Sequence, residues 1–129
     1  SFQDYAFQNI QFAKNFKRRK PSTDHWMNFS VGSSSCNIAV SQIRKRDELK
    51  VELYIHEDKD LFHSLFDNKD TIESGAGLTF DWQELPERKA SRIVIEKSVA
   101  FSDRSQWNTQ FDWIIEVMLK IKKTFKKYL

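Results

Sequence analysis

The most constraining feature of the sequence is an alternation of apolar and polar residues that occurs three times between residues 25 and 55. Met27 and Phe29 occupy alternate positions, and the same period of two returns in segments that begin at Cys36 and Leu49. This period is typical of strands with one buried face, and serines or charged residues separate the segments. The pattern therefore predicts three strands joined by tight turns, an antiparallel meander with one face turned to a core.

The N-terminal segment places apolar residues at helical spacing. It closes in the four cations of residues 17–20, which suit the negative end of a helix dipole, directly before Pro21. The segment predicts one helix whose apolar face is formed by Phe2, Tyr5, Ala6, Phe12, Ala13 and Phe16.

Two later segments also have helical spacing. One follows acidic residues at 57–60 and is expected to end at the glycines of residues 75–77, where glycine allows a left-handed cap. The other is long, and Asp103 or Ser105 can cap its start. Its apolar residues recur at steps of four and three and predict a seam on one helix face: Trp107, Phe111, Ile114, Met118, Ile121, Phe125 and Tyr128.

Two more strands complete the predicted fold. Leu78, Phe80 and Trp82 alternate with polar residues, and a further strand covers residues 91–96. The fold class is α+β, a five-stranded mainly antiparallel sheet with three helices on its apolar face, in the order α-β-β-β-α-β-β-α. The predicted core is Phe29, Val31, Ile38, Val40, Val51, Leu53, Ile55, Leu65, Phe80, Ile93, Ile95, Phe111, Ile114 and Met118.

Length and composition limit the class of protein. The 129 residues fit one α+β domain, 1–129, and 14% aromatic residues exclude a disordered chain. No run of eighteen apolar residues and no signal-peptide pattern is present, so we expect a cytoplasmic protein without membrane contact. The single cysteine, Cys36, agrees with a reducing compartment. A net charge of +3 is too small to identify a partner.

Several sequence blocks resemble a bacterial family of domains of unknown function, the family numbered 4268. The blocks are residues 25–32, 51–55, 85–86 with 89–93, and the closing segment with Trp107 and residues 111–113, so the resemblance spans nearly the whole chain. Within them the residues that carry the family pattern are His25, Trp26, Asn28, Glu52, Tyr54 and Ser91.

The resemblance implies a DNA-defence setting. Domains of this family commonly form the C-terminal part of larger proteins whose N-terminal part looks like a restriction-endonuclease-type nuclease, and some lie near restriction and modification genes. The implied partners are DNA and a nuclease or methyltransferase domain. The resemblance implies no activity, and it allows this chain to be the C-terminal part of a larger one.

Catalysis is the enzymatic alternative, since the element order also suits a divergent PD-(D/E)XK-like nuclease. That chemistry requires an acid on the second core strand and an acid-x-Lys on the third. Residues 36–43 contain no acid, and Glu48-Leu49-Lys50 has the spacing but lies at the edge of a turn. His56 and His63 lack zinc-site spacing with Cys36. The sequence therefore predicts no enzyme, metal or cofactor.

Basic clusters are what remains as a candidate site. Lysines and arginines grouped in this way can neutralise phosphates, and the acids concentrate on the second predicted helix. The predicted DNA-binding residues are Arg44, Lys45, Arg46, Lys50, Arg18, Arg19, Lys89 and Arg92. The hairpin of residues 44–46 is expected to contribute more to DNA binding than the lysines of the last helix, because a short turn between strands holds its side chains in fixed positions.

The predicted function is a non-catalytic accessory domain of a restriction or DNA-defence protein that contacts DNA through basic surface. The alternative is a protein-interaction or dimerisation module. In that case the seam from Trp107 to Tyr128 would pack on a neighbouring domain or on a second copy of the chain, as in two-stranded coils.

Overall fold

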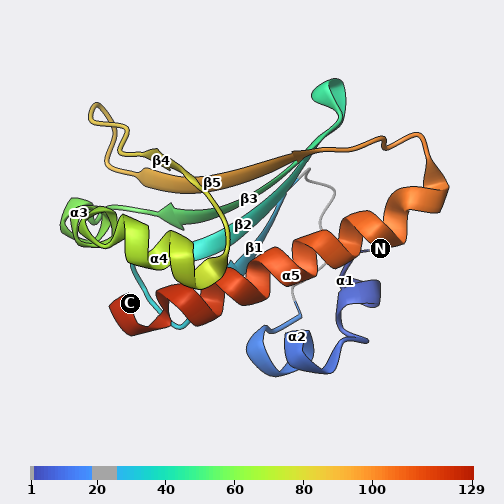
Figure 1. Ribbon diagram of the computed structural model, residues 1–129, viewed down its shortest axis with the longest axis horizontal. Helices are drawn as coiled ribbons and strands as arrows, with labels where there is room; N and C mark the ends of the chain where they lie inside the picture. Colours follow the sequence, from blue (N-terminus) through green and yellow to red (C-terminus); the bar gives the residue numbers. More distant parts are fainter. Residues whose placement is uncertain (1, 19–25) are drawn as a thin grey trace.

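The computed structural model describes residues 2–18 and 26–129, which form one five-stranded sheet and five α-helices (Figure 1). The α+β class is confirmed. In chain order the elements are α1 (Phe2–Ala6), α2 (Ile10–Asn15), β1 (Trp26–Ser30), β2 (Cys36–Ile43), β3 (Glu48–Ile55), α3 (Lys59–Asp67), α4 (Lys69–Ala76), β4 (Asp81–Gln83), β5 (Ser91–Ser98) and α5 (Trp107–Phe125), with short 3₁₀ turns at Arg44–Arg46, Arg104–Gln106 and Lys126–Tyr128.

The three strands of the predicted meander are present, and β3 is the middle strand of the sheet. The strand order is β1-β2-β3-β5-β4, and every neighbouring pair is antiparallel. Leu53 of β3 lies between Ile38 of β2 and Ile93 of β5, and each of these side chains is at most 1% exposed. Directly paired residues point to the same side of a sheet, so this row defines the core face.

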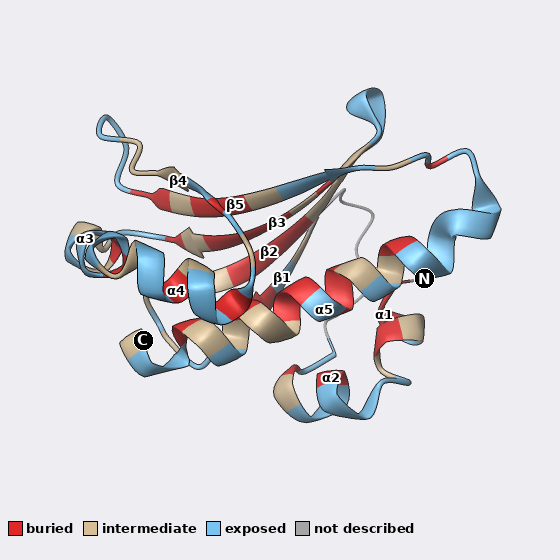
Figure 2. Cartoon of the chain, in the orientation of Figure 1, coloured by how far each residue is buried: buried red, intermediate tan, exposed pale blue. Residues whose placement is uncertain are grey.

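Helices α1, α2, α4 and α5 lie on the core face, and α3 lies at the end of the sheet where β3 ends and β5 begins (Figure 1). The seam of α5 faces the sheet, and its middle residues are at most 1% exposed: Ile114, Met118, Ile121 and Phe125 (Figure 2). The seam is thus occupied within the chain over most of its length. The seam residues that remain accessible to a second helix are the exposed Trp107 and the partly buried Phe111 and Tyr128.

The prediction of one N-terminal helix is wrong, because two short helices stand in its place. Residues 7–9 turn the chain between them, and Asn9 is the N-cap of α2. Its Oδ1 accepts a hydrogen bond from the backbone N–H of Phe12 at 2.9 Å. An asparagine side chain that binds a nearby backbone N–H favours a cap over a helix interior, which explains the break. The break also turns Ala13 to the solvent.

The expected cationic end of that helix is also absent. α2 ends at Asn15, with Phe16 as its C-cap in an extended conformation. Lys17 and Arg18 therefore follow the helix as exposed residues in irregular backbone. Arg19, Lys20 and Pro21 lie outside the described residues.

The second predicted helix is divided as well, into α3 and α4. The Oδ1 atom of Asp58 caps α3 by accepting from the backbone N–H of Leu61 at 2.9 Å. At Asn68 the backbone leaves the helical region, with φ −104° and ψ 14°, and the side chain donates back to Ser64 O at 2.8 Å. Gly77 ends α4 with a φ of 67°, which is the left-handed cap that the glycines predict.

Strand β4 is shorter than predicted because Glu73 of α4 holds the chain before it. Glu73 Oε2 accepts from the backbone N–H of Phe80 at 2.7 Å and from Trp82 Nε1 at 3.1 Å. The N–H of Phe80 is therefore engaged outside the ladder, and pairing with β5 starts only at Asp81. A side chain of α4 thus joins the helix layer to the edge of the sheet.

This carboxylate gives the fold a dependence on pH. The hydrogen bond from the Phe80 N–H, with that from Trp82, holds the pKa of Glu73 below its ordinary value of 4.5. A depressed pKa stabilises the folded state above pH 4.5, and this contribution is lost as pH falls through the folded-state pKa. We expect Glu73→Gln to lower the free energy of unfolding at pH 7 and to flatten its decline below pH 4.5, measured by urea unfolding between about pH 7 and 3.

The exposed loop residue Glu87 offers a matched control. Glu87→Gln removes the same charge and should follow the wild-type curve of stability against pH. If Glu73→Gln also followed that curve, the two hydrogen bonds would contribute nothing to stability.

Twelve of the fourteen predicted core residues are buried, whereas Ile95 and Phe111 are partly buried against the cluster. The core also contains an N-terminal aromatic group, in which the ring of Phe12 lies 4.8 Å from Phe16 and 6.0 Å from Phe29, measured between centroids. Through these ring contacts α1 and α2 pack against β1. Within the described residues, no helix has the length and apolar character needed to cross a membrane.

Candidate nucleic-acid interface

The hairpin cations stand on the exposed 3₁₀ turn Arg44–Arg46 at one end of the sheet. The guanidinium of Arg44 lies 5.4 Å from the centroid of the Phe101 ring. Nη2 of Arg46 lies 3.4 Å from Oε2 of Glu48. Two of the three cations therefore already have a neighbour in the chain, and Lys45 has none of this kind among the described residues.

Lys50 and Arg92 belong to the face of the sheet that points away from the helices. Arg92 Nε donates to Glu52 Oε2, and the side chains are 24% and 8% exposed. This hydrogen bond is the main reason why the pKa of Arg92 is raised. Lys50 is opposite Glu96 in the register. By strand alternation the described strands give this face two cations and four carboxylates, Glu48, Glu52, Asp81 and Glu96, so it is net acidic and repels phosphate.

The remaining predicted cations lie elsewhere. Lys89 Nζ is 3.6 Å from Glu57 Oε1 at the sheet end where β5 begins. That end is seven residues along β5 from the hairpin end, about 23 Å at strand rise. Arg18 forms an ion pair with Asp4 and lies 5.4 Å from the Phe7 ring, below the sheet. Arg19 is not among the described residues. The structure therefore does not bring the predicted set together on one surface.

The described residues of the family pattern make structural contacts. Asn28 Oδ1 accepts from Asn37 Nδ2 at 3.0 Å across β1 and β2. Glu52 holds Arg92, and the ring of half-buried Tyr54 lies 5.2 Å from that of His56. His25 lies outside the described residues, and Trp26 is described as the first residue of β1.

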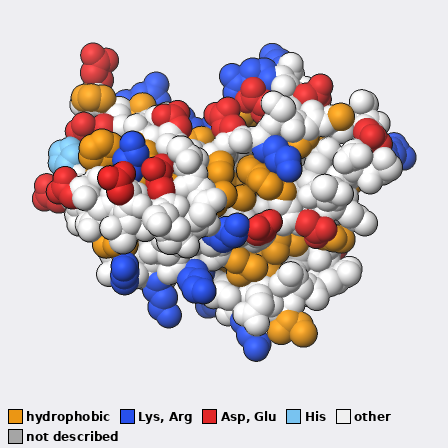
Figure 3. Space-filling model, in the orientation of Figure 1, with side chains coloured by type: hydrophobic (Ala, Val, Ile, Leu, Met, Phe, Trp, Pro, Cys, Tyr) orange, Lys and Arg blue, Asp and Glu red, His pale blue; other side chains and the backbone are white. Residues whose placement is uncertain are grey.

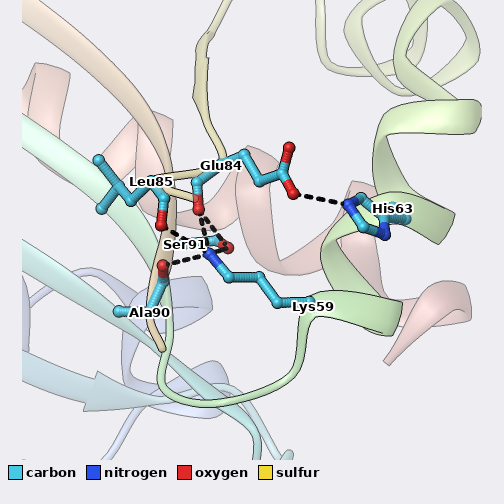
Figure 4. A network of polar contacts seen from close by, with 6 residues as sticks. All are labelled: Lys59, His63, Glu84, Leu85, Ala90 and Ser91. Atoms are coloured by element: carbon cyan, nitrogen blue, oxygen red, sulfur yellow. Dashed lines mark hydrogen bonds and ion pairs between the residues drawn. The ribbon is translucent and has the colours of Figure 1, made fainter. Parts of the chain in front are cut away.

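Ser91, the last residue of the pattern, belongs to a polar network around Lys59 (Figure 4). The ammonium of Lys59 donates to the carbonyl oxygens of Leu85 at 3.0 Å and Ala90 at 2.8 Å, to Glu84 O, and to Ser91 Oγ at 3.0 Å. His63 Nε2 lies 2.9 Å from Glu84 Oε2. The ammonium of Lys59 already occupies the position toward which these carbonyl oxygens point. The network therefore holds the loop between β4 and β5 against α3.

Among the described residues, a strongly basic surface lies at the C-terminal end of α5 and in the turn that follows it. Five lysines occur within eight residues there, and Glu116 is the one acid in residues 116–129. Figure 3 shows cations gathered over this end of α5, at the lower left, and acids gathered above it over α3 and α4. This lysine surface consists of Lys120, Lys122, Lys123, Lys126 and Lys127.

Two open grooves border the lysine surface. The first, of about 750 Å³, lies between α4 and α5, and the second, of about 680 Å³, lies on the other side of α5 beside α2 and Gly32. Lys120 and Lys127 line only the first, Lys122 lines only the second, and Lys123 and Lys126 line both.

The five lysines differ in how far they are already engaged. Lys120 Nζ lies 2.8 Å from Glu116 Oε1 one helical turn earlier. Lys122 Nζ donates to Asn15 O and lies 5.1 Å from the Phe16 ring, and burial lowers its pKa, with a smaller effect from Lys126. Lys123 and Lys126 make no ion pair within the part of the chain that the structure describes. These two lysines, shared by both grooves, are the most available phosphate contacts.

Sequence reasoning found these lysines but ranked them below the hairpin. A helix period shows that they lie off the apolar seam, but it does not show what lies beside α5. The missing information is the packing of α4 and α2 on its two sides, which turns a row of surface lysines into two lined grooves.

Comparison with known proteins adds one match. A family model described as "Domain of unknown function (DUF4268)" matches residues 1–129. No curated protein and no solved structure matches the chain.

Proposed function

The chain belongs to the DUF4268 family over residues 1–129, and we propose that it is a non-catalytic accessory domain that contacts DNA. The lysine surface is the observation that carries this proposal. It concentrates five cations against one carboxylate, whereas the open face of the sheet is net acidic. Phosphate neutralisation by lysine releases counterions, and this effect supplies most sequence-independent affinity for DNA.

The setting that we propose is a restriction or DNA-defence protein. It is supported by the resemblance of the sequence blocks to domains found beside nucleases, which makes a nuclease or methyltransferase domain the expected partner. The non-catalytic role is supported by β2, which carries no acid, and by Glu48, which lies beside Arg46 at the start of β3. In this role the domain supplies DNA affinity and the partner supplies the chemistry.

Two double variants with equal loss of charge test the proposal. Lys123→Gln/Lys126→Gln removes the two lysines shared by the grooves, and Lys45→Gln/Arg46→Gln removes two hairpin charges. With a fluorescent duplex that carries a single-stranded overhang, anisotropy between about 50 and 200 mM salt gives the dependence of affinity on salt. We expect the groove variant to reduce that slope by about 1.4–1.8, since each lost phosphate contact contributes about 0.7–0.9, and the hairpin variant to change it less.

Each contrary result has its own meaning. A larger loss of slope in the hairpin variant would place the contact at residues 44–46, as the sequence alone predicts. No binding by the wild-type chain at about 50 mM salt would refute DNA contact through either surface.

A further inference from the structure

We propose that the groove between α4 and α5 accommodates unpaired nucleotides, so that the preferred ligand of the lysine surface is single-stranded DNA. This inference rests on the proposed function and adds the form of the ligand. It starts from a difference between the two grooves: the first combines cations, an apolar floor and an aromatic ring. The residues that line it include Ile72, Gly75, Ala76, Lys120, Lys127 and Tyr128.

The floor of this groove indicates a ligand with an apolar part. Ile72, Gly75 and Ala76 line it from α4. A Cβ atom added at Gly75 would approach Thr124 Cγ2 to 3.6 Å, so the two helices already lie close there. A duplex offers such a groove only its sugar-phosphate backbone, whereas an unpaired base also offers a flat apolar face.

The rim supplies the two contacts that single strands require. Proteins that bind single-stranded nucleic acid combine a positive groove with aromatic side chains on which bases stack. Here Lys120, Lys123, Lys126 and Lys127 line the groove, and half-buried Tyr128 also lines it. The Nζ atom of Lys127 lies over the Tyr128 ring, 5.2 Å from its centroid. A phosphate bound by Lys127 would draw the ammonium away from the ring and leave the ring face to a base.

The size of the groove agrees with this ligand. Its volume of about 750 Å³ falls within the range of sites for small molecules, roughly 300–1,000 Å³. A base that is already unpaired enters such a site without the unstacking and unpairing cost of a few kcal/mol that a duplex imposes. The groove therefore favours single strands over a duplex of the same sequence.

Anisotropy with a labelled oligothymidine of about 12 nucleotides and a labelled duplex of the same length tests the inference. The wild-type chain should bind the single strand more tightly at equal salt. Tyr128→Leu keeps apolar packing but removes the ring, and we expect it to weaken single-strand binding about fivefold or more while duplex binding stays the same. Tyr128→Phe is the matched control and should bind like the wild type.

A second variant does not depend on packing at Tyr128. Lys120→Gln/Lys127→Gln removes the charges that border only this groove and should reduce the single-strand salt slope by about 0.7 per lost contact. Equal affinity for both forms, or no effect of either variant on the single strand, would overturn the inference. Binding of the overhang probe would then still support the proposed function, whereas the absence of all binding at low salt would refute both.

Discussion

Replacing Leu53 by alanine should lower the free energy of unfolding by about 2–5 kcal/mol, the range for a buried leucine. Leu53 is fully buried in β3, and its neighbours Ile38 and Ile93 come from the strands on both sides. Because the two flanking strands and the helix layer keep their positions, they cannot move in to fill the cavity that the lost side chain leaves. Urea unfolding followed by circular dichroism measures the loss directly.

Leu129 provides the same truncation at a position that is 37% exposed. Leu129→Ala should change stability by no more than about 0.5 kcal/mol, which is typical of surface substitutions. A loss of this small size for Leu53→Ala would mean that Leu53 does not face the core and that the register of β3 is wrong.

Arg92→Met should lower the free energy of unfolding by about 2–4 kcal/mol. It leaves the carboxylate of Glu52, whose side chain is 8% exposed, without its charged partner. Breaking a buried ion pair costs about 3–5 kcal/mol, and the partial exposure of Arg92 reduces this figure. The loss should be visible as a lower urea midpoint with an unchanged slope.

The double variant Glu52→Met/Arg92→Met separates the pair from its surroundings. It leaves neither charge unpaired, so it should lose less stability than Arg92→Met alone. A double variant as unstable as the single one would show that Glu52 needs no partner. In that case Arg92 would be available for the phosphate contact that the sequence alone assigns to it.

The sheet could be predicted because the alternation of apolar and polar residues lies within each strand and assigns the apolar residues to one face. Shifting a strand such as β3 by one residue would turn Val51, Leu53 and Ile55 away from the core, so the alternation determines both the strand and its face. The same argument explains why the predicted core is largely right. Ile95 and Phe111 are only partly buried. Ile95 lies just past the part of β5 that pairs with β4, which ends at Val94, and the period of the sequence does not show where that pairing ends.

The helix breaks could not be predicted from apolar spacing. The apolar residues before and after Asn9 and Asn68 still fall at helical intervals, although the helices stop there. Each break depends on a single asparagine whose side chain binds the backbone locally, and many asparagines in helices do not do this. A periodic pattern shows which residues are buried, but it does not show where one helix ends and the next begins.

The candidate site could not be predicted from the sequence, because the availability of a cation to a ligand depends on neighbours that are distant in sequence. Arg92 is a free cation in the sequence, but in the structure Glu52, forty residues earlier, binds it. Lys123 is one lysine among several in the sequence, but in the structure it borders two grooves. Counting cations along the chain therefore leads to the same proposed ligand class, but the structure leads us to propose the C-terminal lysines ahead of the hairpin, a ranking that the binding experiments test.

The position of β5 between β3 and β4 has a consequence for synthesis on the ribosome. The first three strands can pair as soon as they emerge, but one edge of β3 stays without a partner until Ser91 and its successors appear, 36 residues after Ile55. At about 5–20 residues per second this interval lasts roughly 2–7 s. During it an apolar strand exposes unpaired backbone groups, the usual starting point for aggregation. We therefore expect nascent chains that stall between these positions to be the ones that chaperones retain.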